Sequence, residues 1–229
     1  MRIFGILLAG GTGSRMNLDK PKQFLAFRNK TIMEYTIEKF VKCSSIDEIV
    51  LVMNSEYIGE AKGIIERNNY GKIIDIIPGG NTRQESTYNA LKFIEDRKVD
   101  IVVIHDSVRP FVTNLIIENA IVAAIEYDGS DVCVKTTDTI VCEKDGFILQ
   151  IPDRNILYNG QTPQTFKYNV IKSSHERALQ EKFIETTDDV KIALRYGYKI
   201  KIVEGSYSNI KLTTQEDIEI LKRLFEIEY

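Results

Sequence analysis

The sequence predicts an α/β protein built on an open, doubly wound and mostly parallel sheet, with one protruding β-hairpin arm. Three observations support this prediction. Short apolar runs rich in Ile and Val are typical of parallel strands buried on both faces. Segments with helical periodicity alternate with these runs. The alternation is interrupted once, at residues 139–163.

The first half of the chain contains the regular alternation. The expected strands are Ile3–Leu8, Glu48–Met53, Ile73–Ile77 and Val99–Ile104. The expected helices are Thr31–Lys42, Glu56–Asn68, Thr82–Asp96 and Leu115–Tyr127. Thr82 and Glu85 have the spacing of a capping box, which marks a helix start. Ligands bind such sheets beyond the carboxyl ends of the strands, so we expect a site after these strands.

The second half adds the arm and returns to the sheet. Its expected elements are a strand at Val132–Thr136, hairpin strands at Thr139–Cys142 and Phe147–Ile151, helices at Asn169–Gln180 and Asp188–Arg195, a strand at Lys199–Val203 and a helix at Thr214–Phe225. Asp145-Gly146 is a favourable turn between the two hairpin strands. The segment Pro152–Pro163 shows no strong periodicity. Thr213 and Glu216 have the spacing of a second capping box. Without a Pro/Gly-rich linker, we expect one domain over residues 1–229, with an arm at about residues 137–163 that either meets a second subunit or folds back on its own domain.

Composition excludes several classes of protein. The chain has 229 residues, is 43% hydrophobic and carries a formal charge of −3, as a folded globular protein would. No apolar run reaches the ~18 residues of a membrane span. Three widely spaced cysteines without a C-x-x-C pair fit reduced thiols in the cytoplasm. The body of the chain is acidic, which disfavours nucleic-acid binding because that needs a broad basic face.

The N-terminal segment differs in charge from the rest. Residues 1–30 carry six basic residues and one acidic residue. This basic island is either a solvated loop or a site for a compact anion such as a phosphate cluster. Ala9, Gly10, Gly11 and Gly13 follow the first strand, where glycine amides can approach phosphate oxygens, and Arg15 adds a forked cation.

Neither common Gly-rich pattern is present in this loop. If the pattern Gly-x-Gly-x-x-Gly began at Gly11 and Gly13, Met16 would occupy the position of its third glycine. The Gly-Lys-Ser/Thr sequence of a Walker A motif is also absent. A tight strand-to-loop turn therefore remains the alternative. Lys22 follows Pro21, which stiffens the chain and would present the ammonium group at a fixed place.

Two further strand ends carry candidate residues. After Ile77, the backbone of Gly79-Gly80 could approach a flat base, Arg83 lies beside it and Ser86 could hydrogen-bond it, although an ordinary capped connection fits equally well. Asp106 follows a buried strand and is well placed for a Mg²⁺ that already holds phosphates. Arg109 could hold a second phosphorylated substrate, and His105 is expected to be structural.

Together these segments resemble a known family, the cytidylyltransferases that act on methylerythritol 4-phosphate and on ribitol 5-phosphate. The resemblance spans about residues 3–220. Its motifs, in order, are the Gly-rich loop ending in Arg15-Met16, Pro21-Lys22-Gln23, Gly79-Gly80-x-x-Arg83-x-x-Ser86, His105-Asp106-x-x-Arg109-Pro110, Gln161-Thr162-Pro163-Gln164, Thr187-Asp188 and Asn209-Ile210-Lys211. The resemblance implies a Rossmann-like nucleotidyltransferase fold and transfer of CMP from CTP to a polyol phosphate, with release of pyrophosphate.

The resemblance also implies roles for individual residues. Arg15, Lys22 and Lys211 match catalytic cations, and Asp106 matches an aspartate associated with Mg²⁺. The residues matched to CTP binding are Ala9, Gly10, Gly11, Gly13, Gly80, Arg83 and Ser86. Those matched to the polyol phosphate are Arg109, Thr139, Arg154, Thr162 and Thr187. Because Thr139 and Arg154 match residues of a neighbouring subunit, the arm is expected to form a homodimer.

The sequence separates the two substrate branches poorly. Val108, Phe111 and Tyr158-Asn159-Gly160 resemble the ribitol 5-phosphate branch, whereas Asp153-Arg154 and Arg83-Gln84-Glu85-Ser86 are at home in the methylerythritol branch. Ser208 stands where the latter often has an acid, so a second protein-bound metal is less secure. We expect ribitol 5-phosphate, with CDP-ribitol as product and a role in teichoic acid or cell-wall synthesis. Methylerythritol 4-phosphate, for isoprenoid synthesis, is the alternative.

Two other classes of protein remain as distant alternatives. A glycosyltransferase that uses a nucleotide sugar would be expected to have a D-x-D motif at a strand end. Asp106 lies at a strand end, but it is not part of a D-x-D motif. An inactive nucleotide-binding relative would be expected to lose Arg15, Lys22 or Asp106, and all three are present.

Overall fold

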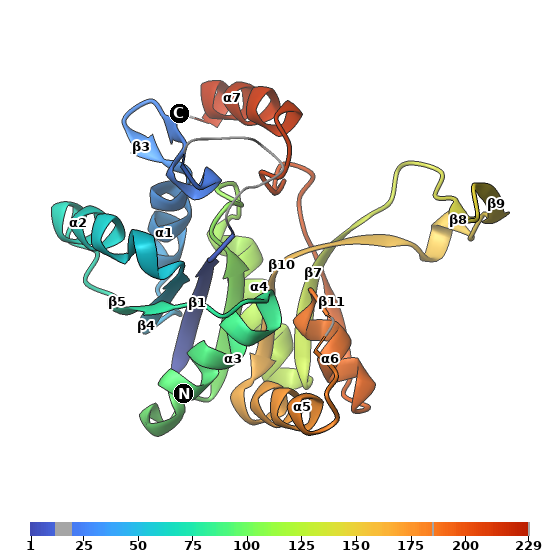
Figure 1. Ribbon diagram of the computed structural model, residues 1–229, viewed down its shortest axis with the longest axis horizontal. Coiled ribbons are helices and arrows are strands. Elements are labelled where there is room, and N and C mark those ends of the chain that lie inside the picture. Colours follow the sequence, from blue (N-terminus) through green and yellow to red (C-terminus); the bar gives the residue numbers. More distant parts are fainter. Residues whose placement is uncertain (12–19, 185, 229) are drawn as a thin grey trace.

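The computed structural model describes residues 1–11, 20–184 and 186–228, and its centre is a seven-stranded sheet (Figure 1). The spatial order is β11-β7-β10-β6-β1-β4-β5. The strands are β1 Ile3–Ala9, β4 Glu48–Met53, β5 Ile73–Pro78, β6 Ile101–Asp106, β7 Gly129–Lys135, β10 Tyr158–Lys167 and β11 Ile200–Glu204. All neighbours pair in parallel except β10, which is antiparallel to both β6 and β7. The expected mostly parallel sheet is confirmed.

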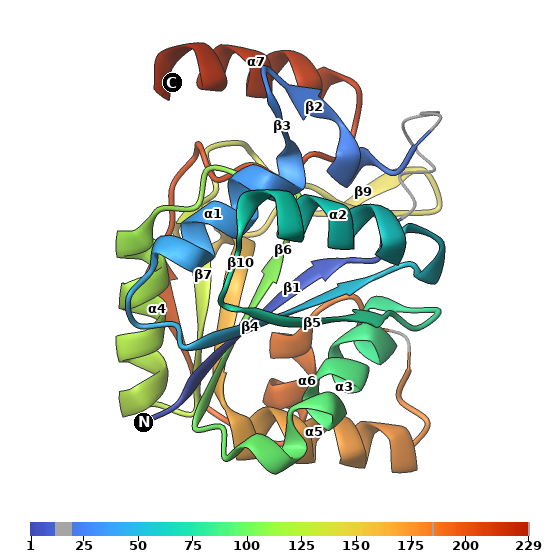
Figure 2. The same ribbon diagram turned by 90° about the vertical axis from the view of Figure 1, so that its left-hand side faces the viewer.

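Helices cover both faces of the sheet (Figure 2). Helices α1 (Ile32–Lys42), α2 (Ile58–Asn68) and α4 (Asn114–Glu126) lie on one face, and α3 (Arg83–Phe93), α5 (Tyr168–Gln180) and α6 (Asp189–Arg195) lie on the other. In β1, Ile3 and Leu7 belong to the first core cluster, whereas Phe4 and Ile6 belong to the second. Successive side chains of a strand point to opposite faces, so an apolar run serves both layers.

The remaining elements are short or lie at the ends of the core. They are β2 Ala26–Phe27, β3 Lys30–Thr31, β8 Cys142–Lys144, β9 Phe147–Gln150, helix α7 Glu216–Glu228, and 3₁₀ turns at Lys22–Phe24, Ser55–Tyr57, Glu95–Arg97 and Arg154–Ile156. Within the described ranges, no helix has the length and apolar character needed to cross a membrane.

The two predicted helix caps have different outcomes. Thr82 accepts a hydrogen bond from the Glu85 N–H at 3.0 Å and caps α3, which confirms that start. The Glu85 carboxylate, however, accepts from the N–H of Asn81. The capping box expected at Thr213 is wrong, because α7 begins only at Glu216 and Asp217 accepts from the N–H groups of Thr213 and Thr214.

Strand β10 is the main difference from the sequence prediction. No strand is expected between residues 152 and 163, yet β10 begins at Tyr158 and lies in the middle of the sheet. Its buried segment, residues 161–166, is mostly polar. A hydrophobic pattern therefore cannot reveal it, and several of its side chains, among them those of Thr162 and Gln164, are instead held by hydrogen bonds.

The arm protrudes from the sheet between the end of β7 and the start of β10 (Figure 1). Its tip is the hairpin β8–β9, and Asp145 and Gly146 have φ angles of 56° and 82° at the turn, as expected for a tight hairpin. The first hairpin strand begins at Cys142, three residues later than predicted.

An aromatic cluster fastens α7 over one end of the molecule. The Phe225 ring lies 5.0 Å from that of Phe27, 4.4 Å from Tyr35 and 4.6 Å from Phe111, measured between centroids. Leu212 is buried in the same cluster. The cluster therefore joins the chain that follows Lys22 to the chain around Lys211.

We expect Phe225→Ala to lower the free energy of unfolding by about 3 kcal/mol, because it empties the centre of this cluster. Chemical denaturation measures the change. Ile227→Ala on the same helix is the control, since Ile227 is 84% exposed and its loss should change stability by less than about 0.5 kcal/mol. Equal effects of the two substitutions would contradict the assignment.

Candidate active site

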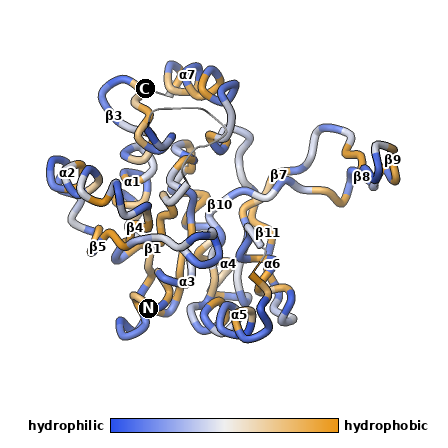
Figure 3. The backbone as a smooth tube through the Cα atoms, in the orientation of Figure 1, coloured by the Kyte–Doolittle hydropathy of each residue, from blue (hydrophilic) through white to orange (hydrophobic). Residues whose placement is uncertain are grey.

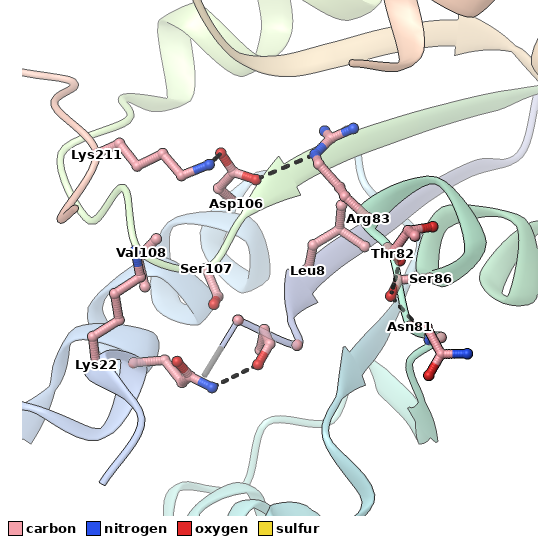
Figure 4. A pocket seen from close by; sticks show the side chains of 15 residues that line it. Leu8, Lys22, Asn81, Thr82, Arg83, Ser86, Asp106, Ser107, Val108 and Lys211 are labelled. Atoms are coloured by element: carbon pink, nitrogen blue, oxygen red, sulfur yellow. Dashed lines mark hydrogen bonds and ion pairs between the residues drawn. The ribbon is translucent and has the colours of Figure 1, made fainter. Parts of the chain in front are cut away.

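A cavity of about 360 Å³ lies beyond the carboxyl ends of the parallel strands (Figure 4). Three strand ends contribute to it: Ala9 ends β1, Gly80 follows β5 and Asp106 ends β6. The lining residues are Leu8, Ala9, Gly10, Gly11, Lys22, Gln23, Gly80, Asn81, Thr82, Arg83, Ser86, Asp106, Ser107, Val108 and Lys211. The cavity thus lies where an open α/β sheet is expected to bind ligands.

The loop after β5 is shaped by Ser86. The Ser86 hydroxyl accepts from the Gly80 N–H at 3.0 Å and donates to the Thr82 carbonyl at 2.9 Å. A Cβ at Gly79 would lie 2.9 Å from Ser86 Oγ, and one at Gly80 would lie 2.2 Å from Glu85 Cγ. A side chain at either position would therefore displace Ser86 or Glu85, so both glycines let the loop lie close to α3. By contrast, a Cβ at Gly11 would meet no atom within 4 Å among the residues that the structure describes.

Lys22 and Gln23 attach their segment to two other parts of the site. Lys22 is buried, and its Nζ donates to the Leu212 carbonyl at 2.7 Å, next to Lys211. Gln23 Nε2 donates to the Ala9 carbonyl at 2.6 Å. Gln23 was not among the predicted site residues, although it belongs to the Pro-Lys-Gln motif. The predicted residues Gly13 and Arg15 lie outside the described residues.

Asp106 stands among three cationic side chains. Its Oδ2 lies 2.8 Å from Lys211 Nζ and 3.6 Å from Arg109 Nε, and its Oδ1 lies 3.8 Å from Arg83 Nε. Burial raises the pKa of Asp106, but the charges of Lys211, Arg83 and Arg109 outweigh it and hold the pKa well below the usual range. The carboxylate is therefore ionised at neutral pH.

His105 belongs to a hydrogen-bond chain behind the cavity. Its Nε2 lies 3.2 Å from the Arg109 carbonyl, which can only accept, so Nε2 carries the proton. Its Nδ1 then accepts from the Thr162 hydroxyl at 2.8 Å, and Thr162 Oγ1 accepts in turn from the Asp106 N–H. Burial lowers the pKa of His105 to about 4, so the ring is neutral at pH 7. These contacts agree with the expected structural role.

Two of the residues matched to the polyol phosphate adjoin Asp106. Arg109 donates from Nη1 to the Asn209 carbonyl at 2.8 Å, and Asn209 Nδ2 donates to the Thr162 carbonyl at 2.9 Å. Thr187 is exposed, directly before Asp188, which caps α6. The structure thus places Arg109 and Thr162 beside Asp106, but none of Arg109, Thr162 and Thr187 is among the residues that line the cavity.

The arm residues Thr139 and Arg154 lie away from the cavity of their own chain. Both are exposed on the protruding arm (Figure 1). Arg154 Nη1 donates to the Thr137 carbonyl at 3.1 Å, within the arm. Within one chain, therefore, the structure does not bring these two residues to the other predicted site residues.

The donor set fits a metal ion held mainly by phosphates. Asp106 is the one acidic residue among those that line the cavity in the described part of the chain. The described ranges contain no group of three or more His, Cys, Asp or Glu that could hold a metal. Ser208 supplies a hydroxyl, 2.7 Å from that of Ser206, and no carboxylate. Mg²⁺ commonly binds one or two carboxylates together with substrate phosphates, which these residues permit.

Comparison with known proteins gives consistent matches over nearly the whole chain. Residues 3–226 match the family model described as 2-C-methyl-D-erythritol 4-phosphate cytidylyltransferase. A protein of that name from Clostridium botulinum (strain ATCC 19397 / Type A) is 43% identical over 222 residues, and one from Thermosipho africanus (strain TCF52B) is 41% identical over 221, each match covering 96% of both chains. The crystal structure of 4-diphosphocytidyl-2C-methyl-D-erythritol synthase from Anaerococcus prevotii DSM 20548 is 31% identical, with a TM-score of 0.87, over 98% of this chain and 96% of that one.

We expect Thr162→Val to lower the free energy of unfolding of the ligand-free protein by about 2 kcal/mol, because the Asp106 N–H and His105 Nδ1 lose their partner. Thr165→Val is the matched control on the same strand. Thr165 is fully buried, and its hydroxyl has no hydrogen-bond partner among the residues described. Its replacement should be nearly neutral, and denaturation curves that shift equally for both variants would contradict the hydrogen-bond chain.

Proposed function

The chain belongs to the 2-C-methyl-D-erythritol 4-phosphate cytidylyltransferase family, and we propose from this membership that it transfers CMP from CTP to 2-C-methyl-D-erythritol 4-phosphate and releases pyrophosphate. The chain is accordingly a nucleotidyltransferase. The observation that carries the proposal is the convergence of Lys22, Asp106 and Lys211 on a cavity bordered by two glycine-rich loops.

The proposed substrate differs from the ribitol 5-phosphate expected from the sequence. The relatives described above carry the methylerythritol name at 41–43% identity, and no finding supports ribitol or a role in teichoic acid or cell-wall synthesis. Two of the markers that favoured ribitol have a role in packing, whereas Tyr158-Asn159-Gly160 are exposed. Val108 and Phe111 are buried in the cluster under α7, where Phe111 contacts Phe225. Phe111 therefore reports how that cluster is filled, whereas Val108 also lines the cavity.

The proposed reaction suits the chemistry of the cavity. A phosphate monoester has a second pKa of about 6, so at pH 7 the nucleophile is already mostly dianionic and needs no general base. His105, which is buried and neutral, is not required for the chemistry. The difficulty is to bring one anion against another, so catalysis depends on positioning and on cations that neutralise developing charge.

In this proposal the residues divide between the two substrates. The backbone of Ala9, Gly10 and Gly11, with Lys22 and Lys211, holds the triphosphate; Gly13 and Arg15 have the same role by family resemblance. Gly80 presents backbone to the cytosine, and Ser86 keeps that loop in shape. Arg109, Thr162 and Thr187 bind the polyol phosphate. Asp106 would hold Mg²⁺, which supplies charge neutralisation at the phosphates when bound.

We also propose that the arm forms a homodimer. Its exposed apolar side chains include Phe147 at 78%, and also Ile148, Leu149, Ile151 and Ile156. In Figure 3, hydrophobic colour appears along the protruding arm, around β8 and β9. Several exposed apolar side chains on one protruding segment are typical of an interaction site. Because the predicted substrate residues Thr139 and Arg154 lie on the same arm, a second copy of the chain would both cover the apolar residues and receive these two side chains.

The function is tested by measuring pyrophosphate release with CTP and Mg²⁺. Methylerythritol 4-phosphate and ribitol 5-phosphate are compared at equal enzyme concentration. We expect kcat/KM to favour methylerythritol 4-phosphate by about tenfold or more, since differences at a few hydrogen-bonding contacts discriminate strongly. A preference for ribitol 5-phosphate would restore the other branch, and release with neither polyol phosphate would contradict the proposed reaction.

A shared site predicts complementation between two inactive variants. Lys22→Ala removes a cation from the cavity, and Arg154→Ala removes the contribution of the arm. Each homodimer should lose about two decades of kcat/KM. In a mixed dimer, one of the two sites has both residues intact, so co-expressed and purified heterodimers should regain part of the activity. Verified heterodimers without recovery would contradict the exchange of arms.

A further inference from the structure

Arg83 lies between two carboxylates, one in the cavity and one in the protein interior. It is the first residue of α3, and its side chain is only 18% exposed. Nη1 lies 2.5 Å from Asp189 Oδ2, Nη2 lies 3.3 Å from Gln164 Oε1, and Nε faces Asp106 Oδ1 at 3.8 Å (Figure 4). Two of its N–H groups therefore donate inside the protein, and its third nitrogen faces Asp106.

Asp189 is a fixed anchor for this arginine. It is fully buried at the start of α6. Its Oδ1 accepts from His175 Nε2 at 3.0 Å, and its backbone N–H donates to Gln164 Oε1 at 3.3 Å. Burial raises the pKa of Asp189, but the Arg83 charge and the His175 hydrogen bond lower it to below its ordinary value. A permanent negative charge therefore stands behind Arg83.

Stability alone is a weak explanation for this network. A buried ion pair costs about as much to desolvate as it returns, and apolar side chains of the same volume often stabilise a fold as well. The network, however, extends in one direction to the cavity, through the contact of Arg83 with Asp106. Arg83 faces Oδ1 of Asp106, whereas Lys211 and Arg109 face Oδ2. The two oxygens are thus held by cations from different elements.

We propose that Arg83 is a positioning residue for the transfer reaction: anchored by Asp189, it fixes the direction in which the Asp106 carboxylate faces the nucleotide cavity. The inference rests on the proposed function. It departs from the sequence-based expectation that Arg83 itself binds CTP. Without the anchor, the carboxylate would turn toward Arg109 and Lys211, and those cations would be drawn away from the phosphates.

The two variants that test this are Asp189→Asn and Arg83→Lys. Asp189 does not line the cavity, so Asp189→Asn changes the anchor without touching a ligand. Arg83→Lys keeps the charge but cannot reach both carboxylates. We expect kcat for pyrophosphate release to fall about tenfold to a hundredfold in both, with little change in the KM for CTP, because misplacement of a reacting group lowers the rate more than binding. The double variant should be no slower than the slower single variant, because both act through one contact chain.

The control is Lys172→Met, which breaks another ion pair, with a buried lysine and an exposed carboxylate, on the same face of the sheet. Lys172 Nζ lies 2.6 Å from the Glu95 carboxylate, and Lys172 belongs to α5, as His175 does. This variant should lose thermal stability and keep the kcat of the wild type. Should Asp189→Asn fail to fold, Arg83→Lys decides the question alone.

Three outcomes would overturn the inference while leaving the proposed function intact. They are a wild-type kcat in the folded variants, a raised KM for CTP with normal kcat, and additive losses in the double variant. The second would return Arg83 to direct nucleotide binding. A wild-type chain that releases no pyrophosphate would instead contradict the proposed function, and this inference with it.

Discussion

The site depends on one buried carboxylate that keeps three cationic side chains together. Arg83 comes from α3, Arg109 from the loop after β6 and Lys211 from the chain before α7, and all three face Asp106. Without that negative charge, the three cations would repel one another in a poorly hydrated space. Three positive charges face a single carboxylate, so the cations have charge left over to pair with bound phosphates. Nucleotidyl transfer requires such cations, because negative charge develops on the phosphates.

Most of the fold could be predicted because parallel strands buried on both faces have nearly continuous apolar sequences. The segment Glu48–Met53 is such a run, and it forms β4 over those same residues. Strand β10 could not be predicted in this way. Its buried residues are mainly polar, and several of them make hydrogen bonds that no sequence period reveals, such as those of Gln164 with Arg83 and Asp188. A buried strand with polar side chains therefore cannot be detected from the periodicity of apolar residues.

The residues of the candidate site that lie at strand ends or in recognisable motifs could be predicted from the sequence. Gly80, Asp106 and Lys211 were identified in that way, and the cavity brings them together. The direction of a side chain was not predictable, because it depends on partners far away in the sequence: Arg83 and Asp189 are 106 residues apart. The substrate markers failed for a related reason, since Phe111 serves the packing under α7 and a sequence motif does not distinguish packing from binding.

The reversed direction of β10 links the arm to the site. A strand antiparallel to its neighbours begins at the edge where they end, so β10 starts beside the carboxyl ends of β6 and β7. Thr162 therefore comes to the Asp106 backbone, and the arm leaves and re-enters the sheet at this same edge. A displacement of the arm would therefore be transmitted to Thr162, because only the first few residues of β10 separate them. If a second subunit holds the arm, as proposed, dimer formation would stabilise the β10 segment that supports Asp106, and assembly and catalysis would be coupled through one strand.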